Sequence, residues 1–144
     1  MKKKKSILKR KSFCGKIIEN DGGRFCMSVR KFCFGQSKIG QVDGYVLEND
    51  QLSVTVLSMG GIIQKLIYNG KDVVCGFDDP DSYLESTCYY GALIGRYCNR
   101  LDHLRIEGVD YPITMNEKGT HQLHGGYCGF DKKLWEVEPG EDSV

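Results

Sequence analysis

The chain has 144 residues, of which 40 % are hydrophobic and 27 % are charged, as in an ordinary globular domain. The net charge of +1 conceals two regions of opposite sign. Residues 1–38 carry twelve Lys and Arg against two acidic residues, and residues 39–144 carry eight against seventeen. An acidic body argues against nucleic-acid binding, which depends largely on Lys and Arg contacts to phosphates.

The N-terminal residues 1–33 form a basic segment that we expect to be disordered, because seven positive charges among its first twelve residues repel one another. A nucleic-acid or membrane tether is the other interpretation of this segment. Ile7-Leu8 is too short an apolar stretch for a signal peptide, and no run of 18 apolar residues occurs in the sequence. We therefore expect a cytoplasmic protein with no membrane partner, whose folded domain spans residues 34–144.

The sequence pattern of the domain predicts a series of short strands separated by glycine-rich turns. Leu52, Val54 and Val56 alternate with polar residues, a period of two. Asn69-Gly70 is a strong hairpin signal. The expected strands are Gly44–Glu48, Leu52–Ser58, Ile62–Tyr68, Asp72–Gly76, Leu104–Glu107, Tyr111–Thr114 (paired with the preceding strand around Gly108) and Leu134–Val137.

Two further segments and the absence of a helical pattern complete the fold prediction. Gly91–Tyr97 is apolar and expected to be buried, and Asp78–Tyr83 is expected to be a polar loop. No convincing amphipathic helix is present. Many short strands at regular spacing favour an all-β fold, an antiparallel β-sandwich. Strands that end at residue 137 would leave unpaired sheet edges, so we expect the sequence to be unfinished.

Seven cysteines occur, an odd number with no C-x-x-C pair, which argues against a zinc ribbon or a full disulfide framework. We expect reduced structural thiols, some of them within apolar strand-like runs. The cysteines are Cys14, Cys26, Cys33, Cys75, Cys88, Cys98 and Cys128.

Two clusters of polar residues could carry chemistry. The first, Gly95-Arg96-Tyr97-Cys98-Asn99-Arg100, places two cations in an apolar setting, and Arg is seldom buried without a partner. The second is His121-Gln122-Leu123-His124-Gly125-Gly126, in which the glycines allow a ligand to approach the backbone closely. Both clusters also admit a purely structural interpretation. A metal site at the two histidines is disfavoured, because no third ligand follows at a recognised spacing.

Taken together, these motifs resemble the aldose 1-epimerase family in order and spacing. The resemblance covers residues 34–135, and its most specific part is G-R-x-x-N-R followed by L-H-G-G and G-F-D-K. The matching segments are Gly60–Ile63, Asp72–Asp78, Gly91–Arg100, Leu123–Gly126 and Gly129–Lys132. The family usually has Asn three residues before the His of L-H-G-G, where this chain has His121.

The resemblance implies a galactose mutarotase-like β-sandwich of about twice this length, of which the chain would be the N-terminal half. It implies interconversion of the α and β anomers of free aldoses such as galactose and glucose. Asn99, Arg100 and His124 match family positions that contact the sugar, with His124 assisting catalysis. The reaction has no redox step, so no cofactor and no metal are expected.

The resemblance also implies that the chain is incomplete as a catalyst. The family's proton-donating His, a further sugar-binding Asp and the catalytic Glu have no match here, so we expect the chain to be inactive alone. One alternative is a non-catalytic carbohydrate-binding β-sandwich that retains Asn99, Arg100 and His124. Another is a nucleic-acid-associated protein that uses its Lys-rich N-terminus.

Overall fold

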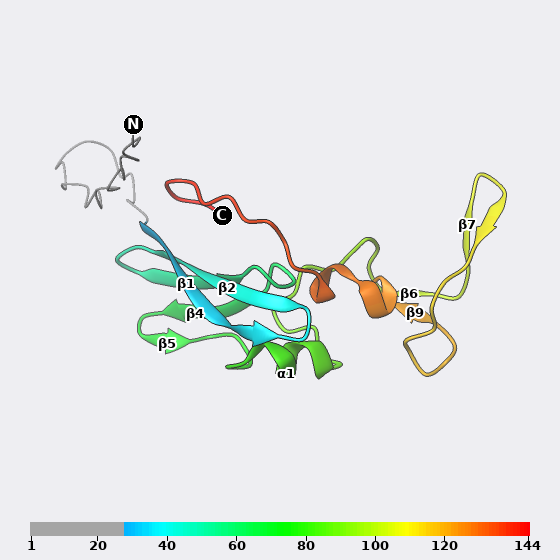
Figure 1. Cartoon of the computed structure of the whole chain (residues 1–144), viewed down its shortest axis with the longest axis horizontal. Coiled ribbons are helices and arrows are strands. Elements are labelled where there is room, and N and C mark those ends of the chain that lie inside the picture. Colours follow the sequence, from blue (N-terminus) through cyan, green and yellow to red (C-terminus); the bar gives the residue numbers. More distant parts are fainter. Residues whose placement is uncertain (1–27) are drawn as a thin grey trace, which may run out of the picture.

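The computed structural model describes residues 28–144, and its largest element is a five-stranded antiparallel sheet. Strands that are consecutive in the chain are neighbours in the sheet, in the order β1-β2-β3-β4-β5 (Figure 1). They are β1 Ser28–Ser37, β2 Gly40–Glu48, β3 Leu52–Leu57, β4 Ile63–Tyr68 and β5 Lys71–Asp72. Because neighbours in the sheet are also neighbours in the sequence, short turns suffice to connect them.

Asparagine side chains and backbones shape two of these turns. Asn49 Oδ1 accepts hydrogen bonds from the N–H groups of Gln51 and Leu52, at 2.9 and 2.8 Å. Asn69 and Gly70 have φ angles of 49° and 73°, the left-handed conformation that a two-residue hairpin turn requires. The predicted hairpin at Asn69-Gly70 is therefore confirmed, although β5 ends at Asp72 rather than continuing to Gly76.

The buried core lies between the sheet and α1, a helix that spans Pro80–Glu85 (Figure 1). Tyr83 from the helix is 4 % exposed and packs with four buried residues from the sheet and the β3–β4 connection. Those residues are Val42, Leu57, Met59 and Ile62. The Tyr83 hydroxyl also accepts a hydrogen bond from the Phe77 N–H at 2.9 Å, which ties the helix to the segment between β5 and α1.

The helix corrects the expectation of a polar loop at Asp78–Tyr83. Asp79 caps it by accepting a hydrogen bond from the Ser82 N–H at 2.8 Å, and Pro80 occupies the first helical position. The hydrogen bonds from Ser82 lower the pKa of the Asp79 carboxyl. With only six residues, the helix is too short for its apolar period to repeat recognisably in the sequence.

After α1, the described chain contains only short ladders and single-turn helices. These are β6 Arg100–Leu101, β7 Leu104–Ile106, β8 Val109–Tyr111, β9 Gln122–Leu123, η1 Gly126–Cys128 and η2 Phe130–Lys132. β6 pairs with β9, and β7 pairs with β8 in a hairpin that projects away from the large sheet (Figure 1). The hairpin turns at Glu107 and Gly108 as expected, but its second strand starts at Val109 instead of Tyr111.

Two segments differ from their expected structure and meet the sheet through isolated contacts. Gly91–Tyr97 was expected to be buried, but Gly95 is its only buried residue and the segment forms no strand. Leu134–Val137 forms no strand either; the Trp135 N–H donates to the Ser58 carbonyl at 2.7 Å. Both segments run past the Met59–Ile62 connection, where glycines at 60 and 61 interrupt regular pairing.

The predicted antiparallel all-β class is confirmed, since α1 and two 3₁₀ turns are the only helices in residues 28–144. No helix in this part of the chain has the length and apolarity needed to cross a membrane. The expected boundary after residue 33 falls inside β1, and residues 1–27 of the basic segment lie outside the described residues. The described cysteines were expected to be reduced thiols, and they are free and exposed: Cys33, Cys75, Cys88, Cys98 and Cys128.

Candidate functional site

The short β6–β9 ladder brings the two polar clusters of the sequence together. Arg100 pairs with Leu123, and the chain on either side continues the contact. The His124 N–H donates to the Asn99 carbonyl at 3.1 Å, and the Asn99 N–H donates to His124 Nδ1 at 2.9 Å. Asn99, Arg100 and His124, the three predicted site residues, thus lie in one place although 25 residues separate Asn99 from His124.

Unusual backbone conformations accompany this junction. Asn99 and His124 have φ angles of 71° and 53°, a left-handed region that non-glycine residues seldom adopt and that recurs at functional sites. Gly125 follows at 89°, and a Cβ atom on it would lie 2.1 Å from the Gly95 carbonyl oxygen. The two motifs therefore approach each other so closely that only glycine fits at position 125.

The contact with Asn99 fixes the proton on the His124 ring. Because Nδ1 accepts the Asn99 N–H, the neutral ring carries its proton on Nε2. Tyr89 packs edge-to-face against the ring, with centroids 4.8 Å apart and planes at 75°. The half-buried imidazole can therefore donate a hydrogen bond from Nε2–H.

The Arg100 guanidinium is held by two oxygen atoms. Nη2 lies 3.0 Å from Glu117 Oε1, and Nη1 donates to Asn99 Oδ1 at 3.4 Å. The hydrogen bond from Arg100 lowers the pKa of the Glu117 carboxyl, so this group is ionised at neutral pH. Glu117 was not among the predicted site residues, because it belongs to no recognised motif.

Asn116 was missed as well, and it fixes the loop that carries Glu117. Its Oδ1 accepts from the Leu123 N–H at 2.7 Å, and its Nδ2 donates to the Leu123 carbonyl at 3.1 Å. The amide thus takes both backbone groups of Leu123, as a neighbouring strand would. An Asn six residues before a strand is not a recognised sequence signal.

The remaining polar residues of the two clusters play other parts. Arg96 lies 5.7 Å from the centre of the Phe130 ring and makes a cation–π contact with it. His121 pairs through its backbone with Glu117, and its Nδ1 lies 2.8 Å from Thr120 Oγ1. Among residues 28–144, no group of three His, Cys, Asp or Glu side chains is arranged to hold a metal ion.

Asp131 of the G-F-D-K motif is a buried carboxylate behind the site. It is 6 % exposed, its Oδ2 lies 3.5 Å from Lys132 Nζ, and its Oδ1 has no hydrogen-bond partner in the described chain. Burial raises the pKa of this carboxyl, and the nearby Lys132 and His124 oppose the shift. Lys132 itself donates to the carbonyls of Tyr83 and Ser86, which ties this motif to the end of α1.

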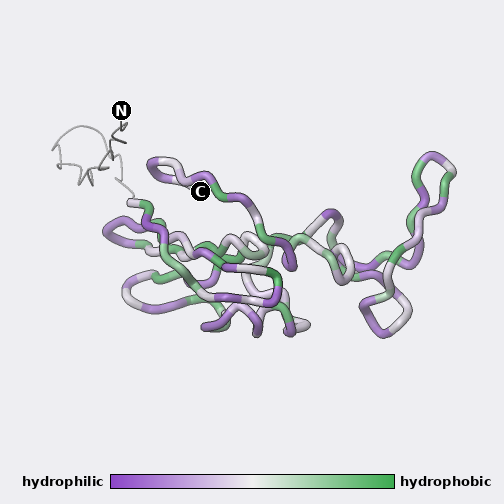
Figure 2. Tube along the Cα trace, in the orientation of Figure 1, coloured by the Kyte–Doolittle hydropathy of each residue, from purple (hydrophilic) through white to green (hydrophobic). Residues whose placement is uncertain are grey.

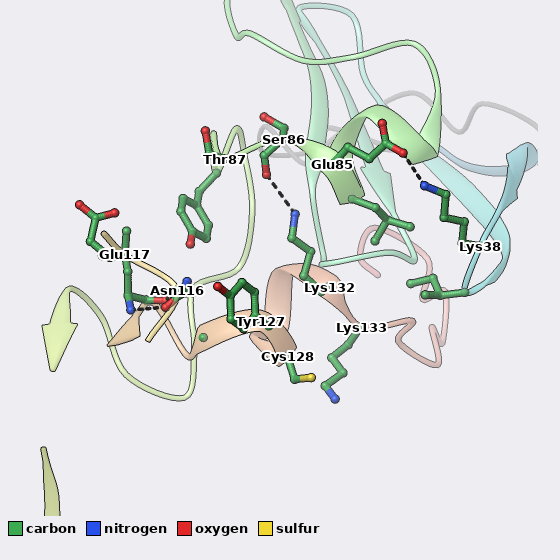
Figure 3. A pocket seen from close by; sticks show the side chains of 15 residues that line it. Lys38, Glu85, Ser86, Thr87, Asn116, Glu117, Tyr127, Cys128, Lys132 and Lys133 are labelled. Atoms are coloured by element: carbon green, nitrogen blue, oxygen red, sulfur yellow. Dashed lines mark hydrogen bonds and ion pairs between the residues drawn. The ribbon is translucent and has the colours of Figure 1, made fainter. Parts of the chain in front are cut away.

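A pocket of about 540 Å³ opens between the end of α1 and η1. Its lining includes Glu117, the partner of Arg100, but not Asn99, Arg100 or His124 themselves. Figure 3 shows Asn116 and Glu117 at one end, the Lys38–Glu85 ion pair at the other and Lys132 between them. Tyr89, which packs on His124, also lines the pocket. Aromatic faces, amides and charged groups around one cavity can bind a small polar molecule.

Comparisons with known proteins identify relatives of this chain. A model of the aldose 1-epimerase family matches residues 43–144. Galactose mutarotases of Bos taurus and Mus musculus are 37 % and 39 % identical over 118 residues, which are 76 % of this chain and 34 % of each relative. The chain thus spans about a third of the length of these relatives.

A solved structure shows the same fold. The galactose 1-epimerase from Lactobacillus acidophilus NCFM superposes with a TM-score of 0.67 at 21 % identity, covering 79 % of this chain and 35 % of that one. The expected β-sandwich class is confirmed by this match and by the antiparallel sheets. From the family match over residues 43–144 and the identity to galactose mutarotases, the chain belongs to the aldose 1-epimerase family.

Proposed function

We propose that this chain forms part of the sugar site of an aldose 1-epimerase that acts on free aldoses such as galactose and glucose. The observation that carries the proposal is the convergence of Asn99, Arg100 and His124 at the β6–β9 junction. The three side chains supply a planar cationic fork, an amide and an imidazole N–H. Such groups bind the hydroxyl and ring oxygens of a sugar.

Mutarotation requires two proton movements on one sugar ring. A base removes the proton from the hydroxyl on C1, and an acid protonates the ring oxygen as the C1–O bond to that oxygen breaks. The C1–C2 bond then rotates, and the reverse steps close the ring on the other face. Acid–base catalysis of this kind typically accelerates a reaction by about 10²–10⁴-fold.

In this scheme the described residues act as donors. Arg100 offers its remaining N–H groups to sugar oxygens, and His124 offers Nε2–H to a hydroxyl or to the ring oxygen. Since Nδ1 is taken by the Asn99 N–H, His124 is not free to act as the base that removes the C1 hydroxyl proton. The carboxylate beside the site, Glu117, is occupied by Arg100.

The described residues therefore bind a sugar more readily than they turn it over. No carboxylate among residues 28–144 matches the catalytic Glu of the family, so we expect little mutarotase activity from this chain alone. This orientation of His124 also favours the second candidate, carbohydrate binding without turnover by the same three residues.

The proposal is tested by titrating D-galactose into the ¹⁵N-labelled chain and following its amide NMR signals. We expect saturable shifts that centre on residues 99, 100 and 124, and their loss in His124→Ala. The matched control is His103→Ala, because His103 is exposed and contacts only the neighbouring Asp102. D-sorbitol, which has no ring oxygen, should bind more weakly. Shifts that centre elsewhere, or none, would contradict the proposal.

A further inference from the structure

The residue that faces Arg100, Glu117, stands on a tightly closed loop. Its N–H donates to the His121 carbonyl at 3.0 Å, and its carbonyl accepts from the N–H groups of Thr120 and His121 at 3.0 and 3.2 Å. Asn116, directly before it, holds both backbone groups of Leu123. The backbone of Glu117 is therefore fixed relative to β9, the strand that leads to His124.

The side chain of Glu117 uses this fixed base to reach Arg100. Its side chain is 21 % exposed, against 51 % for that of Arg100, so the carboxylate is the better-shielded member of the pair. The other contact of the guanidinium, to Asn99 Oδ1, is long at 3.4 Å. A charged acceptor at 3.0 Å is thus the stronger restraint on the orientation of the fork.

A partly exposed ion pair contributes little to the stability of a fold, so stability alone does not explain this pair. The pair has a stronger effect on the orientation of the Arg100 guanidinium. The guanidinium donors lie in a fixed plane, and holding Nη2 determines where the other donors point. Without this restraint, the half-exposed Arg100 would sample several rotamers, and sugar binding would have to select one of them.

We propose that Glu117 is a positioning residue of the sugar site, which holds the Arg100 fork in the orientation that binds the sugar. This inference rests on the proposed function. Glu117 acts through Arg100 and does not touch the reacting atoms. It follows that its effect on sugar affinity should require both its negative charge and the arginine fork.

The first test compares Glu117→Gln with the original chain in the D-galactose titration. Gln keeps the size and an acceptor oxygen but lacks the charge, so we expect the dissociation constant to rise by about twofold to fivefold. The control is Glu138→Gln, at an exposed position outside the site, which should leave the affinity unchanged. The amide spectrum of each variant shows whether it is folded.

A second readout separates positioning from general destabilisation. In an Arg100→Lys background, Glu117→Gln should have little further effect, because the fork that it positions is absent. The affinity of the original chain should also fall as the pH is lowered until Glu117 is protonated, and this fall should be absent in Glu117→Gln. The charged groups that act on Glu117 are Arg100 from β6 and Lys118 and His121 from its own loop.

The outcomes distinguish this inference from the proposed function. If the original chain does not bind galactose, both fail together. If it binds galactose and Glu117→Gln binds equally well, the positioning role is wrong while the sugar site stands. The positioning role would also be wrong if Glu117→Gln lowered the galactose affinity equally in the original chain and in the Arg100→Lys variant. The carboxylate would then act independently of the fork.

Discussion

At the scale of single residues, the site depends on hydrogen bonds that tie one motif to the other. His124 is oriented by the Asn99 backbone, and Arg100 is oriented by Glu117. That Asn99, Arg100 and His124 lie together could be predicted from the resemblance to the motifs of the family. The restraints on them could not, because Asn116 and Glu117 act through contacts that only the folded loop creates.

Arg100→Lys should weaken galactose binding by about tenfold, because an ammonium is a point charge and cannot reproduce the planar fork held by Glu117 and Asn99. The measurement is the NMR titration described above. Arg105→Lys is the control, since Arg105 lies on the projecting hairpin. Equal affinities of the Arg100→Lys variant and the original chain would show that Arg100 does not contact the sugar.

Asp131→Asn should change how stability depends on pH. Burial raises the pKa of Asp131 in the folded chain above its unfolded value, so folding is favoured by this group at low pH and that contribution is lost as the pH rises through the folded pKa. The unfolding free energy of Asp131→Asn, relative to the original chain, should therefore increase from about pH 4 to pH 7. Urea unfolding at several pH values measures this difference, and a constant difference would contradict the burial argument.

At the scale of elements, the fold is predictable where alternation and turn residues coincide. β3 follows from its period-two pattern, β4 from an apolar run, and the turn between β4 and β5 from Asn69-Gly70. β1 was missed because its residues lie in a stretch with high positive charge and no clear period. The helix α1 was missed because its signal is local, an Asp before a Pro, in a segment of six residues.

The contact between the two site motifs should be sensitive to any side chain at position 125. Gly125→Ala combines a left-handed φ of 89° with a Cβ 2.1 Å from the Gly95 carbonyl oxygen. A strained backbone position alone costs about 1–3 kcal/mol, and we expect Gly125→Ala to lower the unfolding free energy by more than this. Gly108→Ala is the matched control, with a φ of 82° and no atom within 4 Å of the added Cβ. Equal losses in urea unfolding would show that the close approach to Gly95 is unimportant.

The sheet core should respond to truncation as a packed interior does. Leu57 is 1 % exposed and belongs to the cluster that joins the sheet to α1. Leu57→Ala should lower the unfolding free energy by about 2–5 kcal/mol. Leu52 lies in the same strand but is 37 % exposed, so Leu52→Ala should lower the unfolding free energy by less. A similar loss at both positions would argue against a core under this sheet.

The β7–β8 hairpin shows what the sequence pattern leaves open at this scale. Ile106 and Val109 are paired across the strands and are 51 % and 54 % exposed, and the hairpin projects from the rest of the described chain. Figure 2 shows hydrophobic positions in this projecting segment. The turn at Gly108 was predicted correctly, but β8 shares only Tyr111 with the expected second strand. The exposure of the hairpin depends on what packs against it and not on its own residues.

At the scale of the whole molecule, family membership and antiparallel fold could be predicted from the order and spacing of several motifs, each weak alone. The convergence of residues 99–100 and 124 needed the β6–β9 ladder, whose strands have two residues each and carry no detectable period. The chain spans about a third of its relatives' length. Among its described residues, His124 accepts the Asn99 N–H at Nδ1, and Glu117 is paired with Arg100.

The most direct test of this account is polarimetry on the isolated chain, at galactose concentrations where NMR shows binding. Freshly dissolved α-D-galactose should approach its equilibrium rotation at the rate seen in buffer, because His124 is held as a donor and Glu117 is paired with Arg100. A full-length galactose mutarotase serves as the positive control. A rate well above buffer that is lost in His124→Ala would show that these residues complete an acid–base pair and would contradict the account.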